Sequence, residues 1–333
     1  MSKRIIFCAD GTWDDPLSAS NVYKIFKAIP VTPDQFPSYD DGVGADGNPL
    51  QKLAGGAIGD GIFQKIKDGY TKIAQLYDAD DALFIFGFSR GAYTARSLAG
   101  MIAICGLPTG KFDANLVEVA FQAYRNPSQR QALLASLSAY NLYDAKLTMV
   151  GVWDTVGALG IPAIVGGVDP ALYSFLDTGL HPDVLNAFQA LAIDERRVQF
   201  PPTLWTPPFG LTQTVRQIWF AGVHCDVGGG YPQTGLSDIT LSWMMSNAAA
   251  LGLQFDPTVV SQYTPIDPND AAAPAHESWN PFWLIPITRR IAPNASISDS
   301  VVLRCQSQGN YRPSNLTFTG GTLANTYQVV PVV

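Results

Sequence analysis

Residues 82–96, ALFIFGFSRGAYTAR, constrain the fold more than any other stretch of the chain. The five consecutive apolar residues Ala82–Phe86 predict a buried strand, and the residues after the motif are apolar at helical spacing. Between the two lies a G-x-S-x-G motif made by Gly87, Ser89 and Gly91. A strand that turns sharply into a helix has room only for small residues beside the turn, and the central side chain is held above the sheet. This order predicts a nucleophile elbow with Ser89 at its tip, and with Gly87 and Gly91 shaping the turn.

Composition limits the class of protein. The 333 residues are 47% hydrophobic and 15% charged, which is enough to bury a large core. We expect a single domain over 1–333, with insertions at about 112–145 and 157–213. The formal net charge of -7 and the absence of clustered Lys and Arg argue against a nucleic-acid partner, because phosphate binding needs concentrated positive charge.

The sequence carries no signal for membrane insertion or classical secretion. After Met1–Arg4 the apolar run is only Ile5–Ala9, and no stretch approaches the roughly 18 apolar residues that span a bilayer. The four cysteines are dispersed without metal-binding spacing, which favours reduced thiols. We therefore expect a soluble protein that is cytoplasmic as synthesised, with specialised signal-less secretion left open. We expect neither a cofactor nor a metal.

Short apolar strands alternate with helical segments along the chain, which predicts an α/β fold with a mostly parallel sheet. We expect an α/β-hydrolase-like arrangement, with helices on both faces of the central sheet and helical or loop insertions that form a lid. The proline-rich residues after about 255 are expected to be irregular. The other expected strands are Arg4–Ala9, Phe36–Asp40, Lys146–Trp153 and Val215–Val223, and the expected helices are Asn21–Ile29, Gly61–Tyr77, Pro182–Asp194 and Ser237–Ala250, the last capped by Ser237 or Asp238.

Four of the predicted strands end in a residue with chemical function, namely Asp10, Ser89, Asp154 and His224. Ligands of open α/β sheets bind outside the carboxyl ends of the strands, so these residues are candidates for a site. A serine hydroxyl needs a base to take its proton, and the base needs an acid to orient it. Ser89, Asp154 and His224 supply the three groups in the order expected of α/β-hydrolases, which is nucleophile, acid and histidine.

Two of these assignments have rivals in the sequence. The chain holds only three histidines, and His276 is a second candidate for the base. His181 precedes a proline and is expected to cap a helix or to lie on the surface. Asp226 follows a predicted strand, as Asp154 does, and is a second candidate for the orienting acid.

The oxyanion of an acyl-transfer reaction needs backbone donors close to the nucleophile. The N–H of Arg90, directly after Ser89, is the expected first donor. The expected second donor is the N–H of Gly11 or Thr12, in the loop after the first strand. We expect Asp10 to shape that loop through hydrogen bonds to its backbone, rather than to transfer protons.

Several segments together resemble a known family: CADGTWDDP, GFSRGAYTAR, GVWDTVGALG, LAIDERRVQFPP and WFAGVHCDVGGGY. From residue 4 to about 250, the chain resembles the uncharacterised α/β-hydrolase-like domain family that includes the phospholipase effectors of bacterial type VI secretion. The resemblance implies a serine esterase or lipase acting on a small-molecule or lipid ester, with the triad on Ser89, Asp154 and His224. A transient contact with a membrane surface is compatible with such a substrate, and the oligomeric state is not indicated.

Two further features have other interpretations. The segment Cys8–Thr12 resembles the D-x-D-G-T motif of haloacid-dehalogenase-type phosphatases, but Cys8 stands where those enzymes have their nucleophilic aspartate. The aromatic and proline-rich segments 200–210 and 279–286 are suited either to a lid or acyl pocket or to plain packing.

Two other functions are compatible with the candidate residues. One is a metal-dependent hydrolase, because carboxylates and imidazoles are common ligands of hydrolytic metals. Its ligands would be Asp10, Asp154, His224 and Asp226. The other is a hydrolase-fold module that binds a ligand without turnover, since a fold alone does not establish catalysis.

Overall fold

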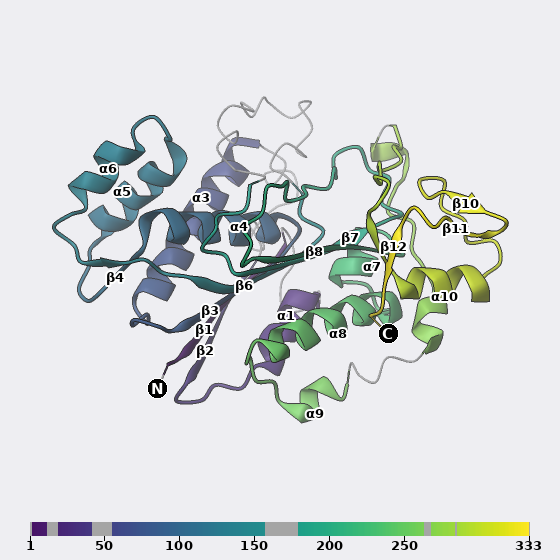
Figure 1. Cartoon of the computed structure of the whole chain (residues 1–333), viewed down its shortest axis with the longest axis horizontal. Coiled ribbons are helices and arrows are strands. Elements are labelled where there is room, and N and C mark those ends of the chain that lie inside the picture. Colours follow the sequence, from purple (N-terminus) through teal and green to yellow (C-terminus); the bar gives the residue numbers. More distant parts are fainter. Residues whose placement is uncertain are drawn as a thin grey trace.

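The computed structural model describes residues 2–11, 19–41, 55–156, 179–262, 268–283 and 285–332. Its centre is an eight-stranded sheet in the order β12-β9-β8-β7-β6-β3-β1-β2 (Figure 1). Neighbouring strands pair in parallel throughout this order. The strands are β1 (Arg4–Ala9), β2 (Gln35–Asp40), β3 (Ala82–Phe88), β6 (Leu147–Trp153), β7 (Asn186–Ala192), β8 (Thr214–Phe220), β9 (Ser296–Ser298) and β12 (Gln328–Val330).

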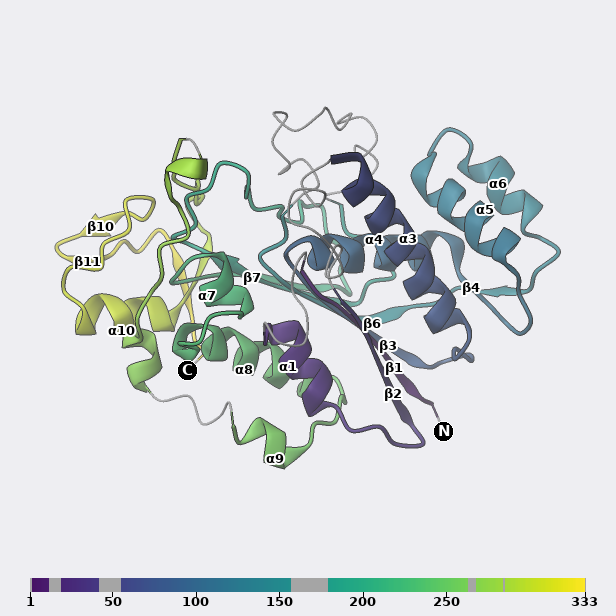
Figure 2. The same cartoon turned by 180° about the vertical axis from the view of Figure 1, so that it is seen from behind.

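Helices cover both faces of the sheet, as Figures 1 and 2 show from opposite sides. Helices α3 (Gly55–Ala74), α4 (Ser89–Cys105), α5 (Ala114–Arg125) and α6 (Arg130–Ser136) lie on one side. On the other side lie α1 (Asn21–Ala28), α7 (His224–Gly228), α8 (Gly235–Ala250) and α9 (Pro257–Val260), with α10 (Asp299–Ser307) towards the β9 and β12 edge. The smaller elements are the pairs β4 (Leu107–Pro108) with β5 (Leu142–Tyr143) and β10 (Phe318–Thr319) with β11 (Thr322–Leu323), and the 3-10 turns Pro268–Ala272 and Pro281–Trp283.

The apolar runs of the strands explain why the sheet is buried on both faces. Successive side chains of a strand point to opposite sides. In β1, Ile5 and Phe7 pack in the core under α3 and α4, whereas Ile6 and Cys8 pack in the core under α1 and α8. A strand with two buried faces reads as a continuous apolar run rather than as an alternating one.

These features confirm the predicted fold class, an α/β-hydrolase-like arrangement with a mostly parallel central sheet. The predicted insertion at 112–145 is helical in its centre, where α5 and α6 lie. The insertion at 157–213 lies in part outside the described residues, which begin again at residue 179. None of the helices in the described ranges combines the length and the apolar character needed to cross a bilayer.

Three local predictions were wrong. The segment Pro182–Asp194 was expected to be a helix, but it contains strand β7, which pairs with β6 on one side and β8 on the other. Helix α8 begins at Gly235 after Thr234, so neither Ser237 nor Asp238 caps it, and Asp238 instead pairs with Lys24 at 2.8 Å. The region after 255 is irregular only in part, because it supplies β9, β12 and α10.

Candidate active site

Ser89 lies at the junction of β3 and α4 with a backbone φ of 58°, in the left-handed region that residues other than glycine avoid. The two glycines of the motif make this turn sterically feasible. A Cβ on Gly87 would lie 2.5 Å from the carbonyl oxygen of Gly91. A Cβ on Gly91 would lie 2.2 Å from the carbonyl oxygen of Ala9. The local backbone therefore has the strained strand-to-helix turn that the sequence predicts, and its geometry depends on two missing side chains.

The structure brings two of the other predicted residues together. Asp154 follows β6 directly, and His224 is the first residue of α7, shortly after β8. The His224 Nδ1 atom lies 2.6 Å from Asp154 Oδ2, and both side chains are buried. With Nδ1 donating to the carboxylate, Nε2 of the imidazole is the nitrogen that can accept a proton.

The imidazole of His224 also lies beside the elbow. Its ring centroid is 4.6 Å from that of Phe88, the residue directly before Ser89. On another side the ring meets Phe200 edge-on at a centroid distance of 5.0 Å. The glycines after His224 permit this packing, because a Cβ on Gly228 would lie 2.0 Å from the Phe88 ring. Two aromatic rings thus fix the plane of the imidazole next to the serine turn.

A buried arginine holds the carboxylate of Asp154 from the far side. Arg289 donates from Nη1 to Asp154 Oδ1 at 2.6 Å and from Nη2 to Oδ2 at 2.9 Å. The same guanidinium donates to the carbonyl oxygens of Ala192 at 2.8 Å and Phe200 at 2.7 Å. Burial raises the pKa of Asp154, but Arg289 and His224 outweigh it and hold that pKa well below its usual range. The carboxylate is therefore charged and fixed in orientation.

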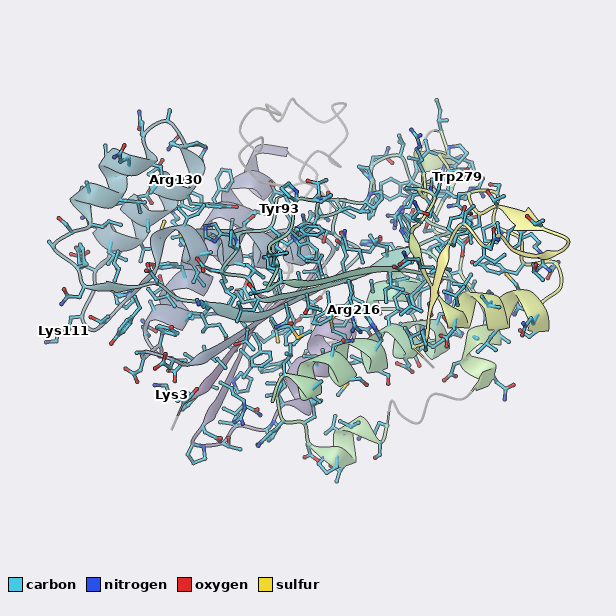
Figure 3. The ribbon with its side chains drawn as sticks, viewed as in Figure 1. Lys3, Tyr93, Lys111, Arg130, Arg216 and Trp279 are labelled. Carbon is cyan, nitrogen blue, oxygen red and sulfur yellow. The ribbon has the colours of Figure 1, made fainter. Side chains whose placement is uncertain are left out.

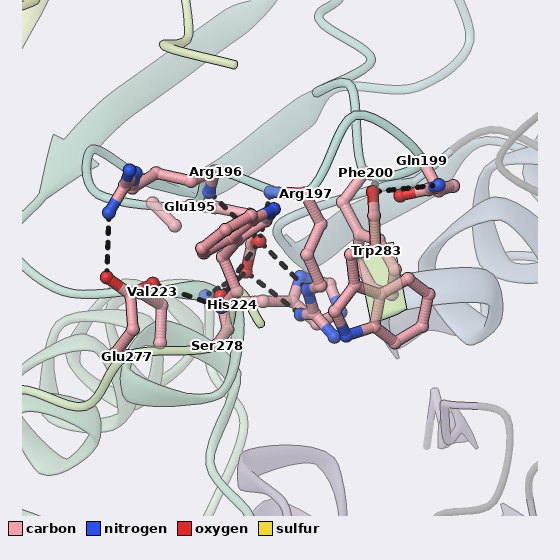
Figure 4. A network of polar contacts seen from close by, with 12 residues as sticks. Glu195, Arg196, Arg197, Gln199, Phe200, Val223, His224, Glu277, Ser278 and Trp283 are labelled. Atoms are coloured by element: carbon pink, nitrogen blue, oxygen red, sulfur yellow. Dashed lines mark hydrogen bonds and ion pairs between the residues drawn. The ribbon is translucent and has the colours of Figure 1, made fainter. Parts of the chain in front are cut away.

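A second buried carboxylate, Glu195, lies behind the backbone of His224 (Figure 4). It accepts the N–H of His224 at 3.2 Å and the hydroxyl of Ser278 at 2.9 Å. Its main partner is Arg197, which donates from Nε and Nη2 at 2.9 Å each. Burial raises the pKa of Glu195, but the hydrogen bonds and charge of Arg197 prevail and lower it to about 2. Glu195 therefore anchors the start of α7, and with it the position of His224.

The pKa of His224 is lowered from its usual value, chiefly because burial disfavours the imidazolium. The hydrogen bond and charge of Asp154 act in the opposite direction, as does the charge of Glu195, whereas Arg197 lowers the pKa further. The imidazole is consequently neutral at neutral pH. A neutral imidazole is the form that can act as a general base.

The rival residues form a pair of their own. His276 Nδ1 lies 2.6 Å from Asp226 Oδ1, and the His276 N–H donates to Asp226 Oδ2 at 3.1 Å. The His276 ring stacks on Tyr231 at 3.9 Å, and its Nε2 lies 3.0 Å from Gln233 Oε1. His181 lies in the loop before β7, where its Nδ1 accepts the N–H of Asp183 at 3.3 Å. Neither histidine contacts Asp154 among the described interactions, so the structure keeps the two His–Asp pairs apart.

The loop after β1 is organised by Asp10. Its Oδ1 accepts the N–H of Gly11 at 2.8 Å, and its Oδ2 accepts the hydroxyls of Ser20 at 2.5 Å and Tyr39 at 2.7 Å. The Gly11 N–H is thus directed at Asp10, and Thr12, the other residue expected as the second oxyanion donor, lies outside the described residues. Arg90, the residue expected to supply the first oxyanion donor, lies in the first turn of α4 directly after Ser89.

The ligands suggested for a metal-dependent hydrolase do not converge. Asp154 faces His224 and Arg289, Asp226 faces His276, and Asp10 faces hydroxyl groups. No cluster of three or more His, Cys, Asp or Glu suited to a metal occurs within the ranges that the structure describes. Cys8 is buried within β1, and burial raises the pKa of its thiol, so Cys8 is a poor substitute for the nucleophilic aspartate of the phosphatases.

Sequence reasoning missed three charged residues around the triad candidates: Arg289, Glu195 and Arg197. Glu195 and Arg197 stand in the LAIDERRVQFPP segment, which the family resemblance had singled out without assigning roles to its charges. A Glu followed closely by Arg after a buried strand was the available signal. Arg289 had no comparable signal, because it lies 135 positions from Asp154.

Comparisons with known proteins agree with the resemblance seen in the sequence. Residues 3–247 match the family described as T6SS, phospholipase effector Tle1-like, catalytic domain. The uncharacterized protein YEL023C of Saccharomyces cerevisiae is 27% identical over 233 residues, which cover 62% of this chain and 33% of the yeast protein. The chain thus spans about a third of the length of that relative.

Two solved structures are similar at a lower level. An uncharacterized protein from Pseudomonas aeruginosa shares 17% identity with a TM-score of 0.47, over 81% of this chain and 50% of that one. The Tle1 effector bound to the VgrG spike from the type 6 secretion system shares 15% identity with a TM-score of 0.48, over 82% and 78% of the respective chains. Since the family match at residues 3–247 covers most of the sequence, the chain belongs to the Tle1-like phospholipase effector family, through its catalytic domain.

Proposed function

We propose that this protein is a serine hydrolase that cleaves carboxylic esters of lipids through an acyl-serine intermediate. Ser89 is the nucleophile, His224 the general base and Asp154 the residue that orients the imidazole. One observation carries the proposal: His224 is held 2.6 Å from the Asp154 carboxylate while its ring lies 4.6 Å from Phe88, next to Ser89. Membership in a phospholipase effector family supports a lipid ester as the substrate class.

The reaction follows from the roles of these groups. Nε2 of His224 takes the proton of the Ser89 hydroxyl as its oxygen attacks the ester carbonyl carbon. The Arg90 N–H, with a donor from the Thr12 region, stabilises the negative charge on the carbonyl oxygen. The intermediate then expels the alcohol, which receives the proton from His224, and Ser89 is left acylated. Water, activated by the same imidazole, releases the carboxylic acid and restores the serine.

The surroundings of Asp154 support a role in orientation rather than in proton transfer. Arg289 keeps its carboxylate ionised and its two oxygens fixed, and His224 Nδ1 donates to one of them. The carboxylate charge stabilises the imidazolium that forms during the reaction, and the carboxylate itself does not take up the proton.

Family membership also supports a route to the substrate. The family is one of type VI secretion effectors, so we propose that the protein leaves the cell by such a specialised system rather than through a signal peptide. A phospholipid at a target membrane is then the substrate that the chain would meet.

The decisive experiment compares Ser89→Ala with wild type on a panel of esters, from short nitrophenyl esters to phospholipids. We expect the turnover number of Ser89→Ala to fall by about a thousandfold or more, with an unchanged thermal transition. A fluorophosphonate probe should label wild type at Ser89 and should not label the variant.

Ser136→Ala is a matched control, because Ser136 is an exposed serine of α6 whose hydroxyl donates to the nearby Leu133 carbonyl, away from the candidate site. It should keep full activity and labelling. Wild-type rates in Ser89→Ala on every ester tested, or activity that survives that change and is lost with a chelator, would contradict the proposal.

A further inference from the structure

His224 is held at two places by the loop that follows β7, residues 195–200 (Figure 4). The Glu195 carboxylate accepts the backbone N–H of His224 at 3.2 Å. The Phe200 ring meets the imidazole edge-on, at an interplanar angle of 79° and a centroid distance of 5.0 Å. One contact therefore fixes the start of α7 and the other fixes the ring, and both come from the same loop.

A single side chain in this loop, that of Arg197, joins the two contacts. Its guanidinium donates from Nε and Nη2 to the Glu195 carboxylate at 2.9 Å each. The guanidinium also lies 3.6 Å from the centroid of the Phe200 ring, within the range of a cation–π interaction. In the backbone, the Arg197 N–H donates to Glu195 at 2.8 Å, and the Arg197 carbonyl accepts the N–H of Phe200 at 3.0 Å. The positions of Glu195 and Phe200 thus depend on the same residue.

The segment that contains Trp283 and Pro286 holds this guanidinium from another side. The Trp283 ring lies 5.3 Å from the guanidinium and meets the Phe200 ring at 86° and 5.8 Å. Pro286 forms an antiparallel bridge with Arg197. The Arg197 side chain is accordingly only 13% exposed. A side chain locked by such packing has the rigidity that the support of a functional group requires.

We propose that Arg197 is a positioning residue for the base of the reaction, because it holds His224 at the backbone through Glu195 and at the ring through Phe200. This inference rests on the proposed serine-hydrolase function. Proton transfer from Ser89 needs Nε2 of His224 within hydrogen-bond distance and correctly directed. A displacement of about 1 Å at a reacting group costs about a hundredfold in rate. Arg197 therefore influences the chemical step through other residues and not by touching the ester.

The charges of the Glu195–Arg197 pair provide a second readout. Burial is the main cause of the low pKa of His224; the charge of Arg197 lowers that pKa further, while Asp154 and Glu195 raise it. Arg289 balances Asp154 on the far side of the imidazole. Removing Arg197 alone leaves Glu195 as an uncompensated negative charge, which favours the imidazolium. Removing both charges of the pair largely restores the balance, a pattern that a merely structural residue would not produce.

The test measures kcat, KM and their pH dependence on a short nitrophenyl ester, together with the rate of fluorophosphonate labelling at Ser89. Arg197→Met keeps much of the side-chain length but removes the charge and the fork of donors. We expect its kcat to fall by about tenfold or more while KM stays within about twofold, because the change acts on the chemical step. The labelling rate should fall by a similar factor. The acidic limb of the kcat/KM profile should move up by about one pH unit.

A double variant, Glu195→Gln with Arg197→Met, separates charge from position. It leaves no unpaired carboxylate in the buried site, so it should fold even if Arg197→Met alone does not. The amide oxygen at position 195 can still accept the His224 N–H. We expect the acidic limb to return to within about half a pH unit of wild type. The kcat should stay about tenfold below wild type, because no guanidinium then lies over the Phe200 ring.

Arg196→Met is the matched control, because it makes the same change one position earlier, on an exposed arginine. The Arg196 side chain is 45% exposed and pairs with Glu277 at 2.9 Å. Its guanidinium lies 5.6 Å from the ring centroid of Trp279, which Figure 3 labels above the central sheet. The kcat, labelling rate and acidic limb of Arg196→Met should equal those of wild type.

The outcomes distinguish this proposal from the serine-hydrolase proposal. A wild-type kcat and labelling rate in Arg197→Met or in the double variant overturn the role of Arg197 and leave the serine hydrolase standing. An acidic limb that stays in place in Arg197→Met, or losses in Arg196→Met as large as those in Arg197→Met, overturn it as well, because the effect would then be general. Failure of the wild-type protein to be labelled at Ser89 overturns both proposals.

Discussion

Two buried carboxylates and two buried or half-buried arginines surround the imidazole of His224. Asp154 pairs with Arg289, and Glu195 pairs with Arg197, so the charges near the imidazole balance before it takes a proton. Leaving one partner of such a pair alone in a buried site is costly. The site is thus a set of mutually dependent charges, whose effects on the pKa of His224 act together with the larger effect of burial.

Arg289 offers a direct test of this dependence through the pH profile. The pKa of His224 lies below its usual value, so kcat/KM should reach its plateau at mildly acidic pH, where the imidazole loses its proton. Arg289→Met removes a positive charge from the other side of Asp154, which favours the imidazolium. We expect the acidic limb of the kcat/KM profile to move up by about one pH unit, with a lower plateau.

Arg289→Lys is the companion variant, since it keeps the charge but not the forked geometry. Its acidic limb should stay near that of wild type while its plateau falls. A limb that is identical in Arg289→Met and wild type would show that Arg289 has no electrostatic influence on the base.

At the scale of elements, the turn between β3 and α4 could be predicted because its requirements are local. The apolar strand, the two glycines and the beginning of the following helix all lie within 15 consecutive residues. Strand β7 could not be predicted in the same way. Several of its residues, NAFQALA, are good helix formers. They form a strand because they pair with β6 on one side and with β8 on the other.

The same distinction between local patterns and distant contacts applies to the residues of the candidate site. The positions of Ser89, Asp154 and His224 at strand ends followed from apolar runs that stop at a polar residue. Arg289 and Glu195 act through partners far away in the sequence, at 135 and 29 positions from Asp154 and His224 respectively. Nothing in a local pattern specifies such pairs.

The turn makes a prediction about two glycines of one helix. A Cβ on Gly91 would lie 2.2 Å from the Ala9 carbonyl oxygen, which is backbone and cannot rotate away. We expect Gly91→Ala to lose about 3 kcal/mol or more of unfolding free energy in urea denaturation. Gly100→Ala is the matched change, because its Cβ meets only the edge of the Tyr124 side chain at 3.0 Å.

Gly100→Ala should lose much less stability than Gly91→Ala, because a ring edge can shift by a few tenths of an ångström whereas a backbone carbonyl cannot, and alanine favours the helix. Equal losses in the two variants would mean that the close approach of α4 to the end of β1 does not restrict the residue at position 91.

Across the whole molecule, the segment 276–283 ties distant elements to the site. His276 binds Asp226 on α7, Glu277 pairs with Arg196 at 2.9 Å, and Ser278 donates to Glu195. At the end of the segment the Trp283 ring meets that of Phe200 at 5.8 Å. The last quarter of the chain is thus fastened onto the loops that hold His224.

These contacts predict that His276 contributes to the stability of the fold and not to the catalytic step. His276→Ala leaves the buried Asp226 carboxylate without its imidazole partner, so we expect a loss of about 1–3 kcal/mol in unfolding free energy. Its kcat on a soluble ester should stay within about twofold of wild type. His224→Ala, measured beside it, should lose activity by about a thousandfold or more. The reverse order of activities would identify His276 as the base.

The position of Arg289 in the sequence affects the order in which the contacts of the site can form during synthesis. One guanidinium joins Asp154 to the carbonyls of Ala192 and Phe200, and it stands more than 80 positions beyond the latter in the order of synthesis. On the ribosome, the residues of the serine turn and His224 are therefore synthesised well before Arg289. The contact that holds the Asp154 carboxylate in its orientation therefore forms only after Ser89, Asp154 and His224 have all been synthesised.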